Sequence, residues 1–343
     1  MPEHSRLIRF GVSIGLAVLL LWLFLRNLDL AAVGEAIRSA RLGWIAVATL
    51  AGLIGTPPIR AWRWGRLLGG QKATFLHRSA SIAIGFAAST LLPARAGEIV
   101  RPVALSRMAA LPFTPCLLSV ALERLIDLLS AVALFVIYAI GWAPETLAGD
   151  EASRFALLRR SALLLGGGAV AVIGFLTVFA LRPELARRLS APFLKIFPEK
   201  VSRRLDGVLT HLLEGIAALK SPRDAAAVAG QSATLWLVIC FQIWATLKAF
   251  DLTYPYPVTF FLLTWGVMGL AIPTPGGVGG YHTAIAYALT GFYAVPKNTA
   301  AAFALVSHAV SFVPITLLGL GFLLAGGFSL RSLSTDRPPE PAA

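Results

Sequence analysis

Three charged residues interrupt an otherwise apolar part of the chain. Glu123, Arg124 and Asp127 lie within the run from Leu111 to Trp142. Each charge at the centre of a membrane helix costs about 2.5–3.5 kcal/mol, so we expect these side chains to turn inward and pair. Glu123 and Asp127 share one helix face, and Arg124 is spaced to reach Asp127. The pattern predicts either a structural ion-pair lock or a site that binds substrate or couples proton movement.

A second charged group contains Arg95, Glu98 and Arg101. Glu98 and Arg101 are spaced to pair on one helix face. The planar fork of donors on arginine suits a phosphate group, so Arg95 and Arg101 are candidate phosphate ligands. Either arginine is also a candidate partner for the carboxylates of Glu123 and Asp127. The alternative is that these arginines are interfacial residues on the cytoplasmic side.

Two helix-like apolar stretches are broken in matching ways. Pro93 stands four residues before Gly97, and Pro273 stands four residues before Gly277. One break lies in the first third of the chain and the other in the last third. Paired breaks of this kind in the two halves of a membrane protein are typical of inverted-repeat transporters with a site near the bilayer midplane. The alternative is that they are ordinary kinks.

The second break continues into a glycine run. Irregular backbone at membrane depth leaves amide groups unpaired unless protein or a water-filled cavity satisfies them. We therefore predict that Gly276, Gly277 and Gly279 let the backbone approach a head group or flex during gating. His282 follows the run and is a candidate for binding a head group or carrying a proton.

The composition defines the elements that must position these residues. Of the 343 residues, 57% are hydrophobic and only 14% are charged, whereas a soluble domain carries about 25% charged residues. This predicts an all-α polytopic membrane bundle, because several apolar runs are near spanning length. These runs are 10–25, 44–59, 161–181, 225–247 and 300–328. The net charge of +13 resides in loops that flank these runs, which argues against nucleic-acid binding.

The distribution of charge predicts the topology. Segments 60–78 and 182–224 are basic and should be cytoplasmic, whereas 143–160 is neutral and should be external. This assignment is consistent only if 79–110 and 258–290 are re-entrant hairpins, since each arm of about 14 residues is too short to span. We expect six full spans and two oppositely entering hairpins, about eight hydrophobic segments in all, arranged as an inverted repeat. Both termini should be cytoplasmic.

We expect one integral-membrane domain over residues 1–330 and a disordered tail at 331–343. Within that domain, 182–224 is either an amphipathic segment on the cytoplasmic membrane surface or a helical loop packed on the bundle. The basic and aromatic residues Arg60, Trp62 and Arg63 are interpreted first as an interfacial anchor and second as a lipid head-group contact.

Together these motifs resemble the lysylphosphatidylglycerol synthase transmembrane region family, also called flippase-like integral membrane proteins. The motifs are Arg60-Ala-Trp62-Arg63-Trp64, Pro93-Ala-Arg95-Ala-Gly97-Glu98, Glu123-Arg124-Leu-Ile-Asp127 and Pro273-Thr-Pro275-Gly276-Gly277-Val-Gly279. The resemblance covers about residues 5–330 and implies a lipid flippase module. It does not extend to the soluble aminoacyl transferase of some relatives. The chain departs from the family at His282, where a Glu is expected soon after the glycine run.

The expected function is therefore movement of a phospholipid or lipid-linked glycan between leaflets of a bacterial or archaeal cytoplasmic membrane. We expect membrane lipids with an anionic or phosphate-bearing head group as partners, and a lipid-biosynthesis enzyme is a candidate protein partner. No catalytic residue, metal site or cofactor is predicted, because the chain has no nucleotide or metal-binding motif. Two alternatives are an integral-membrane transferase using a lipid-linked donor, with Glu98 or Asp127 as acid or base, and a non-transporting partner of a lipid synthase.

Overall fold

The apolar runs form helices. The computed structural model describes residues 3–92, 95–143, 150–194, 196–199, 201–202, 205–207, 209–210, 213 and 221–326. These residues contain no strand, so the predicted all-α membrane bundle is confirmed. Pro93, the predicted tail 331–343 and much of the segment 195–220 lie outside the described residues.

Four continuous helical stretches in the described part of the chain are long and apolar enough to cross a membrane. They are Leu42–Leu67 (α3, Leu42–Leu50; the π-turn η1, Ala51–Gly55; α4, Thr56–Leu67), Ser153–Phe179 within α8 (Asp150–Leu181), α11 (Pro222–Ala249) and α14 (Lys297–Ala325). A fifth is obtained if α1 (Glu3–Leu25) and α2 (Leu30–Ser39), bent by 86°, form one broken span. The prediction was six. The charge-bearing helix α7 (Phe113–Gly141) has 29 residues and is also long enough.

Two helical hairpins occupy the regions where breaks were predicted. The first joins α5 (Phe75–Leu91) to α6 (Gly97–Met108), and the second joins α12 (Val258–Ala271) to α13 (Gly280–Tyr293). The longest arm has 17 residues, about 26 Å, which is shorter than the hydrocarbon core of about 30 Å. The first arm begins before residue 79, because Thr74 caps it by accepting a hydrogen bond from the His77 amide at 3.1 Å.

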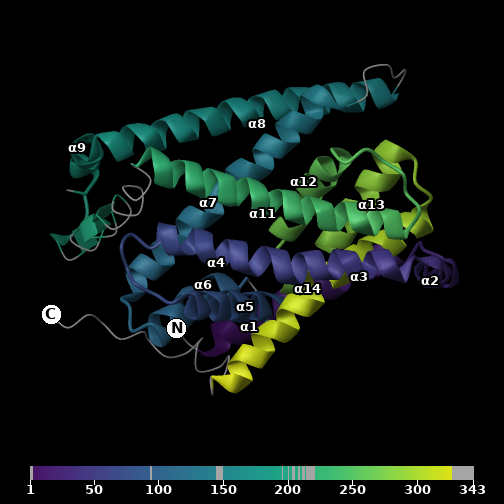
Figure 1. The fold of residues 1–343 in the computed structure, drawn as a ribbon, viewed down its shortest axis with the longest axis horizontal. Helices are drawn as coiled ribbons and strands as arrows, with labels where there is room; N and C mark the ends of the chain where they lie inside the picture. The colour runs from purple at the N-terminus through teal and green to yellow at the C-terminus, as the bar shows by residue number, and fades with distance from the viewer. Residues whose placement is uncertain are drawn as a thin grey trace.

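The two hairpins start from opposite ends of the bundle (Figure 1). At one end Arg66, in the last turn of α4, pairs with Asp224 in the first turn of α11 at 2.6 Å, and the first hairpin follows α4. At the other end the Arg41 amide donates to the Ala249 carbonyl at 2.8 Å, and the second hairpin follows α11. Opposite entry is the arrangement that an inverted repeat requires.

Glycines let the arms of each hairpin approach closely. A Cβ on Gly97 would overlap the carbonyl oxygen of Gly85 on the facing arm. In the second hairpin, a Cβ on Gly269 or Gly280 would overlap the carbonyl oxygen of the other residue. Both hairpins therefore depend on backbone-to-backbone packing, which only glycine permits at these positions.

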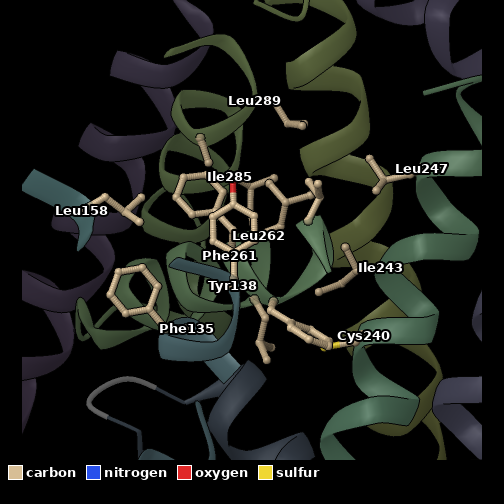
Figure 2. Close-up of a cluster of buried hydrophobic side chains, with 14 of the residues drawn as sticks. Phe135, Tyr138, Leu158, Cys240, Ile243, Leu247, Phe261, Leu262, Ile285 and Leu289 are labelled. Atoms are coloured by element: carbon tan, nitrogen blue, oxygen red, sulfur yellow. The ribbon is translucent and has the colours of Figure 1, made fainter. Parts of the chain in front are cut away.

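The largest hydrophobic core surrounds the second hairpin. Figure 2 shows Phe261 of α12 and Ile285 of α13 close to Tyr138 of α7, with Leu158 of α8 and Ile243 of α11 at the periphery. With Phe303 of α14, six described helices contribute to one cluster, which fixes the second hairpin against the spanning helices.

Helix α8 runs along the outside of the bundle (Figure 1). Phe155 and Leu158 near its start are buried, whereas Leu164 and most later apolar residues are exposed. In the following helix α9 (Pro183–Leu194), Leu189 and Phe193 are also exposed. The placement of segment 182–224 on the membrane surface or against the bundle stays a prediction.

Candidate functional site: a buried arginine–carboxylate cluster

The inward-facing charges gather between α4, α6 and α7. Glu123 and Asp127 project from one face of α7 and are 0% and 6% exposed. Arg101 reaches them from α6, and Arg60 and Arg63 reach them from α4. All three of these arginines are buried. The predicted inward-facing ion-pair cluster is therefore present, with α4 as an additional contributor.

Each buried carboxylate has one closely bound arginine. Both terminal nitrogens of Arg101 donate to the Glu123 carboxylate, at 2.9 and 2.7 Å. The Arg101 guanidinium also lies 4.0 Å from the centroid of the Trp64 ring. Arg63 donates to Asp127 at 2.7 Å and to Ser232 of α11 at 3.0 Å. Charge-assisted hydrogen bonds of this length are strong ones, and a bidentate pair also fixes orientation.

Two other arginines are held more loosely. Arg60 lies 3.4 Å from Glu123 and 3.3 Å from Asp127. Arg124 lies 3.3 Å from Glu98 and 3.5 Å from both Glu123 and Asp127. Among the described residues, four arginines thus face three carboxylates, which leaves one excess positive charge. An uncompensated charge inside a membrane bundle is costly and is a functional-site hypothesis by default.

The glycine run at the second break has left-handed backbone. The φ angles of Gly276, Gly277 and Gly279 are 60°, 73° and 83°, which side chains rarely tolerate. The freed carbonyls are bonded by spanning helices: Ser13 of α1 donates to Pro273 at 2.8 Å, and His308 Nε2 of α14 lies 2.8 Å from the Gly276 oxygen. Protein groups thus satisfy this irregular backbone.

His282 caps the helix that starts after the run. Its Nδ1 accepts a hydrogen bond from the Gly279 amide at 3.3 Å, and its ring packs against Phe24 and His308. The side chain is 4% exposed. This accounts for a histidine at the position where the family resemblance leads us to expect Glu, since either side chain can accept from backbone amides at a helix start.

Arg95 belongs to the contact between the two hairpin tips. It has a left-handed backbone with φ of 54°, and its guanidinium donates to the Leu270 carbonyl near the end of α12. Nearby, the hydroxyls of Thr90 and Thr316 are 3.1 Å apart. The contact between Arg95 and Leu270 joins the first hairpin to the second, and it complements the negative end of the α12 dipole.

The predicted site residues therefore fall into two groups. One is the charge cluster, which brings together Glu98, Arg101, Glu123, Arg124 and Asp127. The other lies at the hairpin tips and contains Arg95, Pro273, Gly276, Gly277, Gly279 and His282. Arg101 pairs with Glu123, one of the partners expected from the sequence, and not with Glu98 on its own helix. Arg95, the other candidate partner, contacts the second hairpin instead of the described carboxylates of the cluster.

Arg60 and Arg63 are the cluster residues that the sequence interpretation misplaced. They were assigned to the membrane interface, yet they are 7% and 0% exposed and paired. Their neighbour Trp62, at 58% exposed, does face outward. The signal in the sequence is the spacing of the charges. Arg60 and Arg63 are three residues apart and share one helix face, as do Glu123 and Asp127, which are four residues apart, so the two faces can pack against each other with their charges paired.

Helical hairpins that start from opposite ends of a spanning bundle, together with the internal charge cluster, define an all-α polytopic integral membrane protein. The family model for the lysylphosphatidylglycerol synthase TM region matches residues 7–319. The chain belongs to this family, which confirms the resemblance of its motifs.

One curated relative aligns with nearly the whole chain. The chain is 26% identical over 356 aligned positions to this protein of Haloferax volcanii, named glycosyltransferase AglD. The alignment covers 96% of this chain and 56% of the relative. The chain thus spans little more than half the length of that relative. Together with the family, this supports a membrane protein that handles lipids or glycans.

Proposed function

We propose that this protein moves an anionic, phosphate-bearing lipid between membrane leaflets. The observation that supports this most directly is the excess positive charge of the cluster formed by Arg60, Arg63, Arg101 and Arg124 with three carboxylates. A buried positive site in a membrane helix bundle can neutralise the negative charge of a lipid head group inside the membrane. The surrounding lipid tails cannot do this.

The hairpins supply a route for alternating exposure. Their arms start from opposite ends and their tips are joined through Arg95 and Leu270. Rocking of one repeat against the other around a fixed site is the usual mechanism of inverted-repeat transporters. In this proposal the end with Arg66 and Asp224 is cytoplasmic, because the basic segments 60–78 and 182–224 lie there.

A reconstitution experiment tests the proposal. Purified protein in liposomes should accelerate the transbilayer movement of fluorescent phosphatidylglycerol above the rate in protein-free liposomes. Replacing Arg124→Gln should slow this movement about tenfold, since a hydrogen bond to a charged group contributes about 1.5–3 kcal/mol. The half-exposed position of Arg124 makes loss of folding a minor effect. The measurement is the fraction of label that an impermeant quencher reaches with time.

Arg66→Gln is the matched control for this experiment. Arg66 forms an equally exposed ion pair with Asp224 at the end of α4, so its loss should leave the rate within about twofold. A wild-type rate equal to that of empty liposomes would contradict the proposed function. Equal slowing by Arg66→Gln and Arg124→Gln would show that surface charge, and not the cluster, sets the rate.

The printed name of the Haloferax volcanii relative favours a second candidate, an integral-membrane glycosyl transferase. Glu98 would then be the better general base, because its side chain is 38% exposed while Asp127 is bound to Arg63 at 2.7 Å. Incubation with a lipid-linked sugar donor discriminates the two functions. A transferase forms a new glycolipid and loses this activity in Glu98→Gln, whereas a translocator changes only the leaflet in which the donor lies.

A further inference from the structure

The hydrogen-bonding capacity of the cluster is unevenly used. Each guanidinium carries five N–H donors. Both terminal nitrogens of Arg101 are engaged by Glu123, and those of Arg63 are engaged by Asp127 and Ser232. Arg60 instead reaches both carboxylates through Nη1 alone, at 3.3 Å or more. Arg124 likewise makes only ion-pair contacts of 3.3 to 3.5 Å. Among the terminal nitrogens of the described cluster, those of Arg60 and Arg124 therefore have the capacity to bind a further acceptor.

The cluster as a whole is short of hydrogen-bond acceptors. Within the described chain, the Nε atoms of Arg60, Arg63, Arg101 and Arg124 are all buried without a hydrogen-bond partner, and that of Arg124 makes only the 3.3 Å ion-pair contact with Glu98. A buried donor without a partner costs about 1–3 kcal/mol. Arg60 as a whole is 7% exposed and lies in contact with the same carboxylates as Arg124. An acceptor that reaches both residues would relieve this cost.

Arg124 and Glu98 form the accessible edge of the cluster. Their side chains are 40% and 38% exposed, whereas the other cluster residues are at most 8% exposed. The adjacent Ile99 and Leu128 are exposed apolar residues on α6 and α7. A charged pair next to exposed apolar side chains on membrane-embedded helices lies where a lipid head group can approach from the side.

We propose that a phosphodiester group binds to Arg124 and Arg60, and that Glu98 competes with it for Arg124. Binding exchanges the 3.3 Å contact between Arg124 and Glu98 for contacts to phosphate oxygens, which suit the arginine fork. The single excess positive charge of the cluster matches a phosphodiester better than a phosphomonoester. One excess positive charge is neutralised by one phosphodiester anion, whereas a phosphomonoester carries close to two negative charges at neutral pH.

This inference deepens the proposed function by naming the ligand group and the two arginines that bind it. It rests on the proposed function only in taking a lipid as the molecule that carries the phosphodiester. Binding is measured separately from transport. Full-length protein in detergent would be titrated with phosphatidylglycerol, and the lipid-bound fraction read by native mass spectrometry. Diacylglycerol with the same chains reports binding by tails alone. Soluble glycerophosphoglycerol reports binding of a free phosphodiester.

The variants are expected to act in opposite directions. Glu98→Gln removes the competing carboxylate and should tighten phosphatidylglycerol binding about tenfold, whereas Arg124→Gln should weaken it about tenfold or more. Arg66→Gln, at the exposed pair with Asp224, should leave the affinity unchanged. Diacylglycerol should bind much more weakly than phosphatidylglycerol, with no difference between variants.

Several results would overturn the inference. Weaker or unchanged binding in Glu98→Gln that remains monodisperse contradicts competition, and unchanged binding in Arg124→Gln contradicts the site. Equal binding of diacylglycerol assigns recognition to the tails. Tight binding of glycerophosphoglycerol retains the phosphodiester site but contradicts a lipid source. Variant-dependent binding without any lipid movement in liposomes would refute only the proposed function.

Discussion

Glu123→Ala should strongly destabilise the folded protein. The substitution removes the partner of both terminal nitrogens of Arg101 and one partner of Arg60 and Arg63, so these buried arginines face Asp127 as the remaining buried carboxylate. Breaking a buried ion pair by removing one partner costs about 3–5 kcal/mol. For a protein of this size the melting temperature should fall on the order of 10 °C. Fluorescence-detected size exclusion after heating measures this change.

Two further variants identify the cause. Glu98→Gln, at the exposed edge of the cluster, should lower stability by less than about 1 kcal/mol. The double substitution Arg101→Met with Glu123→Leu removes a matched pair of charges and should recover most of the lost stability, since apolar replacements of buried pairs are often neutral. A double variant as unstable as Glu123→Ala would show that shape, not charge balance, governs this site.

Gly97→Ala should disrupt the first hairpin. The added Cβ would overlap the Gly85 carbonyl oxygen and the Ser89 hydroxyl, and the backbone oxygen cannot move without displacing α5. Overpacking of this kind costs about 3 kcal/mol. Because the hairpin carries Glu98 and Arg101, lipid movement should be lost together with thermal stability. The same heating assay and the liposome assay measure the two effects.

Gly230→Ala is the matched control, because here the change from glycine to alanine should raise the stability instead of lowering it. Gly230 lies inside α11 with no atom near the position of a Cβ. Alanine there should raise stability by up to about 1 kcal/mol, because glycine weakens a helix interior. Comparable destabilisation by both substitutions would indicate that close hairpin packing is not the reason for sensitivity at Gly97.

The sequence was sufficient for the fold class and for the hairpin positions. Apolar runs of spanning length predict helices whatever their neighbours, and the matched Pro–Gly pairs end helices through local backbone chemistry. The second break, for example, was predicted from Pro273 and Gly277 and occurs between α12 and α13. Such features depend on residues close in sequence, which explains why they could be predicted.

The choice among the candidate partners of each charge could not be predicted in the same way. Glu98 and Arg101 are correctly spaced to pair on α6, but each pairs with a residue of α7 instead. Arg60 and Arg63 at the end of a span have the same local pattern whether they face lipid or protein. The outcome depends on how each helix is rotated about its own axis, and tertiary packing sets that rotation.

For α4 the rotation follows from the π-turn Ala51–Gly55. Its hydrogen bonds span one more residue than those of an α-helix, which turns everything downstream back by about 100°. Counted from the buried Ala48 at about 100° per residue, Arg60 would point about 120° away in an uninterrupted helix, but points only about 20° away after the π-turn. The π-turn thus rotates the part of the helix that follows it, and this rotation decides which face of α4 points toward the cluster. Deleting a single residue there would let the segment close into a regular α-helix and leave Arg60 facing the cluster, whereas a regular helix of the present length would turn Arg60 about 120° away.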